Sequence, residues 1–301
     1  MAKSLTNSGT EMVSNLVLDQ FVQELTVVQA FTLDCNPSPV YRGDCVKVLS
    51  VGTASAALAF DKTAGYSFQD SEAEGLDVQL NQHPFVSCTL SDADFAGSSI
   101  LTLDAFARSK GYAFGNSVVS EFLNNFTSST FCPTSMSFES SSFGVTSVTQ
   151  ISNQMDQMGV PNFSRTLILN PHYHSILRQD KAVQNAICFG SPEVIQKGII
   201  SNLDTFSKVT KCNVFPGTED NVFGYAVCPQ AAILAMRPVI TQDNKAYNQY
   251  RNFTDEATGM TITFRSWLSR SKASMNAVWD IAWGWVSGNP LGIIKLYHSG
   301  N

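Results

Sequence analysis

The hydrophobic positions along this chain change their period several times, and each period predicts a different element. Between Val13 and Val28, apolar residues recur every three to four positions after a polar leader, which predicts an amphipathic helix. A longer run of the same kind, Leu103 to Phe126, predicts the longest helix of the chain, although Gly111 and Gly115 weaken it. Two long amphipathic helices are therefore expected.

Alternation of apolar and polar residues predicts strands elsewhere. Two such segments are DCVKV (44–48) and GLDVQLN (75–81), and the C-terminal third adds MTITFR (260–265) and GIIKLY (292–297). The segment between the first two strands, 49–74, is too long for an ordinary hairpin turn. A long two-stranded extension cannot bury a face by itself, so we expect a neighbouring surface to complete it.

Turn and capping residues predict shorter elements. Ser147 with Gln150 has the capping-box pattern that begins a helix. RTLIL (165–169) predicts a buried strand, after which Asn170 caps a helix with Pro171 at its first position. Further strands are expected at VTKCNVF, VFGYAV and ILAMRPV, whereas the polar run TSSTFCPTSMSFESSS is a candidate domain boundary. The order of elements predicts a mixed α+β fold.

Composition narrows the class of partner. A chain of 301 residues with 44% hydrophobic residues can bury a sizeable core. Its 19 Lys and Arg against 25 Asp and Glu give a net charge of −6, so contact with nucleic acid should be weak and local. The N-terminus has no signal-peptide pattern and no apolar run reaches membrane-spanning length, so we expect a cytosolic protein without a membrane partner.

The residues that could carry chemistry do not form a recognisable motif. On a helix, His172 and His174 lie about 200° apart, so they cannot chelate one ion. Cys188 with either histidine is the only nearby thiol–imidazole combination, which leaves a Cys-His hydrolase as an alternative. Phosphate-loop, dinucleotide and serine-nucleophile motifs are absent, so no catalytic residue, metal or cofactor is expected. The cysteines, read as reduced apolar residues, are Cys35, Cys45, Cys88, Cys132, Cys188, Cys212 and Cys228.

The order of features supports a resemblance. A polar arm and a GD-x-V-x-V strand (43–48) precede the long extension, and QHPFVSCTLSDADF then leads into the long helix. RTLILNPHYHSILRQD, NVFGYAVCPQAAILAMRP and a closing WDIAWGWVSGNPLGIIKLY follow. In this order and spacing, from Val13 to Tyr297, the chain resembles the major capsid proteins of tailed bacteriophages, and most of all the coat proteins of podovirus-like phages.

The resemblance implies the Hong Kong 97-type capsid fold, whose parts are an N-terminal arm, an extended E-loop, a peripheral domain with a spine helix, and an axial domain. Mapped onto this chain, these are 1–42 for the arm, 43–82 for the E-loop, 83–130 with 238–278 for the peripheral domain, and 131–237 with 279–301 for the axial domain. Such subunits form pentamers and hexamers that close into an icosahedral head around double-stranded DNA.

The resemblance also implies partners and contact residues. Copies of the chain should bind each other, with a separate scaffolding protein, a portal protein, possible decoration proteins and weakly bound packaged DNA as further partners. The protein would be a non-enzymatic component of the virion, assembled in the cytoplasm of the host bacterium. An encapsulin-type nanocompartment shell shares the fold and stays an alternative. The candidate inter-subunit contacts are Phe21, Leu25, Phe60, Lys62, Tyr66 and Phe68.

Overall fold

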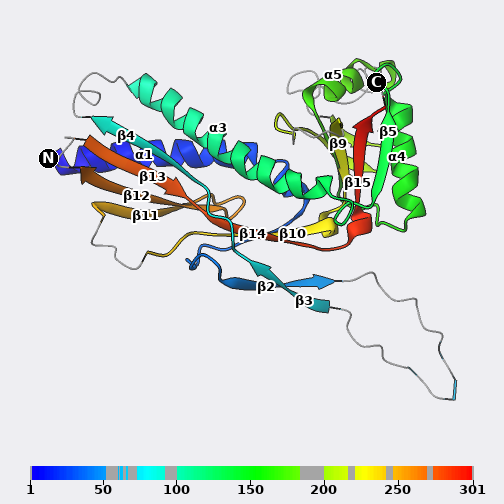
Figure 1. The fold of residues 1–301 in the computed structure, drawn as a ribbon, viewed down its shortest axis with the longest axis horizontal. Helices are drawn as coiled ribbons and strands as arrows, with labels where there is room; N and C mark the ends of the chain where they lie inside the picture. Colours follow the sequence, from blue (N-terminus) through cyan, green and yellow to red (C-terminus); the bar gives the residue numbers. More distant parts are fainter. Residues whose placement is uncertain are drawn as a thin grey trace.

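The computed structural model has two lobes joined by a three-stranded sheet, and a hairpin projects from the junction (Figure 1). The structure describes residues 2–51, 60, 62–63, 66, 73–91, 100–183, 200–215, 221–241, 247–269 and 274–299. Helices and strands are mixed along the chain, so the expected α+β class is confirmed.

The first lobe packs two long helices on one face of an antiparallel sheet. The helices are α1 (Ala2–Glu24) and α3 (Ile100–Asn124). A short 3-10 turn, η2 (Asn125–Thr127), follows α3. The strands lie in the order β11 (Gln249–Thr254), β12 (Thr261–Ser269), β13 (Ser274–Asp280) and β4 (Phe85–Ser91). The indole N–H of Trp279 on β13 donates to Ser14 Oγ on α1 at 3.1 Å, so the sheet holds α1 directly.

Helix α1 crosses α3 closely because α3 offers two glycines at the contact. A Cβ on Gly111 would lie 2.5 Å from the Val17 carbonyl oxygen, and one on Gly115 would lie 2.5 Å from the Cβ of Glu24. The Phe21 ring stacks on the Phe114 ring at 4.6 Å between centroids. The glycines that lower helix propensity therefore serve the helix–helix contact.

The bounds of the N-terminal helix are the first correction to the sequence-based expectations. Helix α1 begins at Ala2, so it includes the polar leader, and it ends at Glu24 before the short turn η1 (Val28–Ala30). Its apolar side chains belong to the same buried cluster as those of α3 and β13. The buried residues of this N-terminal helix are thus part of the core of the first lobe.

The second lobe contains a six-stranded mixed sheet. Its strands lie in the order β5 (Thr134–Phe138), β15 (Ile293–His298), β9 (Val222–Val227), β6 (Arg165–Leu169), β8 (Phe206–Lys211) and β7 (Ile200–Leu203). Strands β15 and β5 are parallel, as are β6 and β8, whereas β9 is antiparallel to both β15 and β6. Helices α4 (Val145–Gln157) and α5 (Pro171–Gln179) contribute to the core of this lobe.

The strand-to-helix corner of this lobe forms as predicted. All five residues of β6 are buried, which explains the apolar run Leu167–Leu169 that ends the strand. The Asn170 side chain accepts a hydrogen bond from the Tyr173 backbone N–H at 2.9 Å, with Pro171 at the first helical position.

Two local predictions for the second lobe are wrong. The polar connector contains β5, in which Met136 and Phe138 turn inward while Ser135 and Ser137 are exposed, so a half-buried edge strand was mistaken for a loop. Helix α4 begins at Val145 instead of at Ser147, because the Asp180 carboxylate accepts the Val145 N–H at 2.9 Å. The Asp180 carboxylate comes from another part of the chain, so the local sequence does not predict it, whereas Ser147 accepts the Gly144 N–H at 3.4 Å from the third position of the helix.

The lobes meet at a sheet of three strands, β1 (Thr32–Cys35), β10 (Ala232–Arg237) and β14 (Ala282–Ser287), with short turns η3 (Pro229–Ala231) and η5 (Pro290–Gly292) beside it. The buried Arg237 guanidinium donates to the Asp34 carboxylate at 2.7 Å, which ties β10 to β1. Strands β1 and β14 were not predicted, since β1 alternates over only four residues and β14 does not alternate polar with apolar residues.

The projecting hairpin confirms the first two predicted strands. Strand β2 (Cys45–Val51) pairs antiparallel with β3 (Ala73–Gln79), and Val46 lies opposite Val78. The hairpin extends beyond both lobes in Figure 1.

Candidate functional site

The end of the β2–β3 hairpin exposes large aromatic side chains. Phe60 is 59% exposed and Tyr66 is 80% exposed, and their ring centroids lie 5.0 Å apart. Lys62 beside them is also exposed, whereas Phe68 lies outside the described residues. A Phe or Tyr side chain that packs against another surface buries about 150–250 Å². The Phe60–Tyr66 pair is therefore suited to bind another protein surface.

The root of the same hairpin is already buried in the chain. Val78 and Leu80 are completely buried and share an apolar cluster with Ile233 and Ala282 of the middle sheet. Gln82 exchanges two backbone hydrogen bonds with Trp283, of 3.0 and 2.9 Å. The expectation of an extension that needs a partner therefore applies to its far part, because the chain itself covers the root.

Two of the six candidate contacts are corrected by the structure. Phe21 and Leu25 are both 0% exposed and pack in the core of the first lobe with α3. They were expected to be contacts because they lie on the apolar face of the arm's helix, and the resemblance places the arm across neighbouring subunits. Since that face is buried against the chain's own helix, it leaves no side-chain surface for a neighbouring subunit.

The two neighbouring histidines face different surroundings, as the helical period predicted. His172 is exposed, whereas His174 is 6% exposed on the buried side of α5. Burial lowers the pKa of His174, and the positive charges of Arg178 and Lys211 lower it further. The two imidazoles therefore do not converge on one ion.

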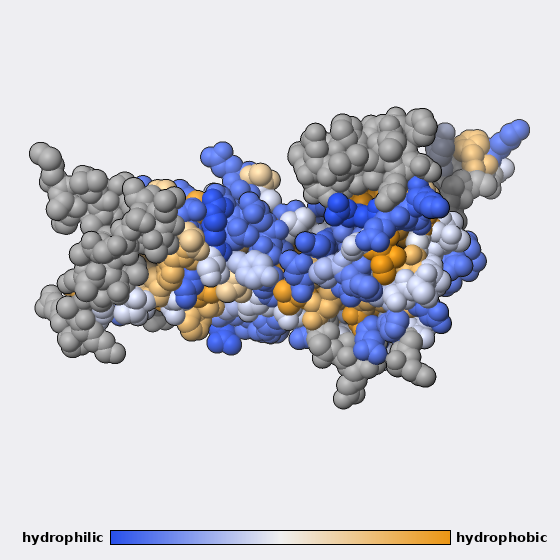
Figure 2. Space-filling view, turned by 90° about the horizontal axis from the view of Figure 1, so that it is seen from above, coloured by the Kyte–Doolittle hydropathy of each residue, from blue (hydrophilic) through white to orange (hydrophobic). Residues whose placement is uncertain are grey.

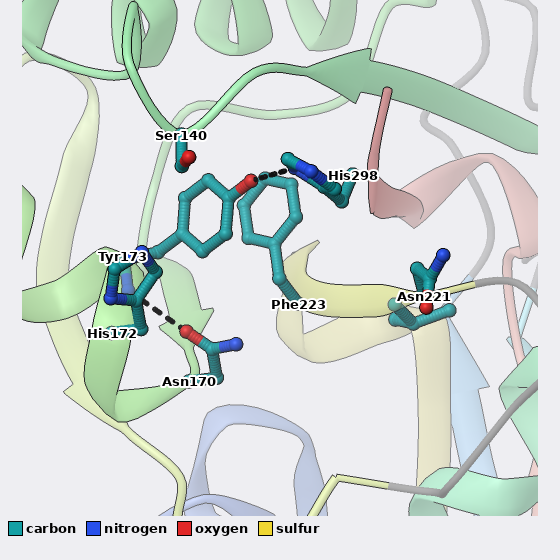
Figure 3. A pocket seen from close by; sticks show the side chains of 8 residues that line it. Ser140, Asn170, His172, Tyr173, Asn221, Phe223 and His298 are labelled. Carbon is teal, nitrogen blue, oxygen red and sulfur yellow. Dashed lines mark hydrogen bonds between the residues drawn. The ribbon is translucent and has the colours of Figure 1, made fainter. Parts of the chain in front are cut away.

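His172 lines an open cleft of about 480 Å³ in the second lobe (Figure 3). Within it the Tyr173 hydroxyl lies 2.7 Å from His298 Nδ1, and the Tyr173 ring stacks on Phe223 at 3.6 Å between centroids. Burial raises the pKa of the Tyr173 hydroxyl, so it stays a neutral hydrogen-bonding group. The lining residues, none of which carries a carboxylate, are Ser140, Asn170, His172, Tyr173, Asn221, Val222, Phe223 and His298.

The buried and half-buried cysteines that the structure describes are poorly suited to nucleophilic chemistry, whereas Cys45 is exposed. Burial raises the pKa of Cys35 to about 12 and those of Cys132 and Cys212 to about 11. Burial also raises the pKa of Cys88 and of Cys228. A catalytic thiol needs the opposite shift, because the thiolate is the nucleophile. Cys188, on which the hydrolase alternative rests, lies outside the described residues.

The described part of the chain offers no group of three or more His, Cys, Asp or Glu side chains that could hold a metal ion. None of its helices combines the length and the apolar character that crossing a membrane requires. In the view of Figure 2, apolar residues form separate patches among hydrophilic ones on the described surface.

Comparison with known proteins gives a match in structure but not in sequence. No family model matches the chain, and no curated protein is similar to it in sequence. Among solved structures, the capsid of cyanophage P-SCSP1u matches with a TM-score of 0.55 at 11% identity, over 90% of this chain and 87% of that one. A structure from Mycobacterium phage Che8 matches with a TM-score of 0.52 at 15% identity, over 84% of each chain.

A virus-like particle from Pyrococcus furiosus also matches, with a TM-score of 0.54 at 12% identity, over 95% of this chain and 98% of that one. Each match covers more than four-fifths of this chain, so the likeness concerns the architecture as a whole. This chain therefore has the fold of phage capsid subunits, the Hong Kong 97 fold.

Proposed function

We propose that this chain is the major capsid protein of a tailed bacteriophage. Copies of it form pentamers and hexamers that close into an icosahedral head around double-stranded DNA. The observation that carries the proposal is an architecture shared with the cyanophage capsid over nine-tenths of the chain. The exposed Phe60–Tyr66 pair on a projecting hairpin supports it, because such a pair in a shell would be covered by a neighbouring copy.

The parts of the chain take roles in this proposal by their position. The first lobe, with α3 as the spine helix, is the peripheral domain, and the second lobe is the axial domain. The hairpin is the E-loop, with Phe60, Lys62 and Tyr66 as its contacts to another copy. The division of the chain at the sheet β1-β10-β14 is the structural basis for this assignment.

The further partners follow from the same role. A separate scaffolding protein, a portal protein and possible decoration proteins complete the head, which is assembled in the cytoplasm of the host bacterium. The packaged DNA contacts the shell weakly, since a chain with a net charge of −6 does not form a strongly basic lining. Catalysis is no part of this function.

A nanocompartment shell is the second candidate, because the Pyrococcus furiosus virus-like particle matches almost the entire chain. The two functions differ in what the shell encloses. Particles that protect long double-stranded DNA from nuclease support the phage head, and particles that co-purify with one enzyme support the compartment.

The first test is size-exclusion chromatography with light scattering on the full chain, with and without a co-expressed scaffold candidate, followed by electron microscopy of the heaviest fraction. Closed shells, tubes or capsomer rings are expected. A monomer under every condition would contradict the capsid function, and selective labelling of Cys188 in that monomer would favour the hydrolase alternative.

A further inference from the structure

A buried carboxylate lies where the hairpin root, the first lobe and the middle sheet meet. Asp280 ends β13, and its side chain is 4% exposed. Its Oδ2 lies 3.1 Å from His83 Nε2 and 3.2 Å from an Arg265 guanidinium nitrogen. His83 belongs to the short segment between β3 and β4, and Arg265 belongs to β12. One carboxylate thus joins the hairpin root to two adjacent strands of the first lobe.

The arginine of this cluster reaches a fourth segment. Arg265 donates to the Val239 carbonyl at 3.3 Å, and the Tyr250 hydroxyl donates to the same carbonyl at 2.9 Å. Its guanidinium also lies over the rings of Tyr247 and Tyr250, at 5.8 and 5.9 Å. Val239 is in the connection that leaves β10 of the middle sheet for the first lobe.

The two contacts of Asp280 are not equivalent. Arg265 and Asp280 belong to adjacent strands that the β12–β13 ladder already holds together. His83 lies outside that ladder, between Gln82, which pairs with Trp283, and Phe85, which pairs with Asp280, so its side chain adds a contact to the backbone pairing that holds the hairpin root. The hairpin has a separate anchor on the middle sheet, where Val78 and Leu80 are buried.

We propose that His83, Asp280 and Arg265 form a latch that sets the direction in which the β2–β3 hairpin leaves the body of the subunit. His83 is the positioning residue, because it is the member that the hairpin root contributes. A buried carboxylate is costly unless it is paired, so the latch closes in one geometry and resists small displacements of the root. The role of the latch in assembly rests on the proposed function. In an assembled shell, the latch would orient the hairpin so that Phe60 and Tyr66 contact a neighbouring copy.

The latch is tested first on the unassembled full-length subunit by hydrogen–deuterium exchange. His83→Ala should raise exchange at least about tenfold in the hairpin root, 73–82, because it removes a hydrogen bond to a charged group. Exchange in β6 and β9 of the second lobe should not change. His83→Gln keeps an amide donor near the position of Nε2, so it should restore most of the protection. His172→Ala, which removes an exposed histidine from α5, is the matched control.

Two results would overturn the latch. One is unchanged exchange in the root of His83→Ala, and the other is an equal increase in both lobes, which would indicate only a general loss of stability. A second experiment measures the rate of particle formation by light scattering. His83→Ala should form particles more slowly than the unsubstituted chain, and His83→Gln should form them at a rate close to that of the unsubstituted chain. If the unsubstituted chain forms no particles, the proposed function fails while the exchange result still decides the latch.

Discussion

The crossing of α1 over α3 allows two physical effects to be set against each other at one residue. Gly111→Ala adds a methyl group at a position whose Cβ would lie 2.5 Å from the Val17 carbonyl oxygen and 2.8 Å from the Gln20 Cβ. Both contacts are tighter than atoms can tolerate, and one is with backbone, so α1 has to move away. Overpacking of this kind costs about 1–3 kcal/mol.

Helix propensity predicts the opposite sign. Replacing a glycine inside a helix by alanine stabilises the helix by about 0.8–1 kcal/mol. For Gly111→Ala the close approach should win, because one contact is with backbone, and the free energy of unfolding should fall by up to about 2 kcal/mol. Gly115→Ala should cost less, because its nearest neighbour is the side chain of Glu24 at the end of α1.

Urea denaturation of the unassembled subunit measures this difference. Ser109→Ala on the exposed side of the same helix is the control, and it should stabilise the protein slightly because propensity acts there alone. If Gly111→Ala raised the urea midpoint as the control does, the close packing of α1 on α3 would be refuted, and α1 would be a free arm after all.

Three further changes test other parts of the structure. Phe60→Ser combined with Tyr66→Ser should lower the fraction of assembled particles in light scattering without changing the urea midpoint of the subunit, because both rings are exposed; undiminished assembly would remove the hairpin end from the contacts. Asn170→Ala should cost about 1 kcal/mol of stability by removing the cap of α5, and Asn170→Ser should recover most of it; equal urea midpoints for the two variants would argue against the cap. The folded state lowers the pKa of His174 below its ordinary value of 6.5, so the unfolded chain binds its proton first and stability should fall as the pH drops below about 6.5. His174→Gln should flatten that fall between pH 7.5 and 5.5 in urea titrations, and an unchanged slope would show that other groups cause it.

Periodic segments are the part of the fold that could be read from the sequence. The hairpin strands around Val46 and Val78, the buried strand RTLIL and the Asn170 cap all depend on neighbours within a few residues. Local spacing also excluded a shared metal ion at His172 and His174, since the angle between them is a property of the helix.

Features that depend on distant residues could not be read in this way. Whether Phe21 faces a neighbouring copy or the chain's own α3 is decided by Gly111 and Gly115, about 90 residues further along, which look only like weak points in a helix. Likewise His83 and Asp280 are 197 positions apart, and no local sequence motif at either residue predicts that they are in contact.

The sequence by itself determined the mixed α+β class, the two long helices, the strands with clear alternation and the two strands of a long hairpin, because periodicity and turn chemistry act over short distances. Only the tertiary structure decided that the N-terminal helix is core, that Asp180 caps α4, and that a buried carboxylate fastens the hairpin root. These depend on close approach and on the pairing of buried charges, which exist only once the chain has brought distant residues together.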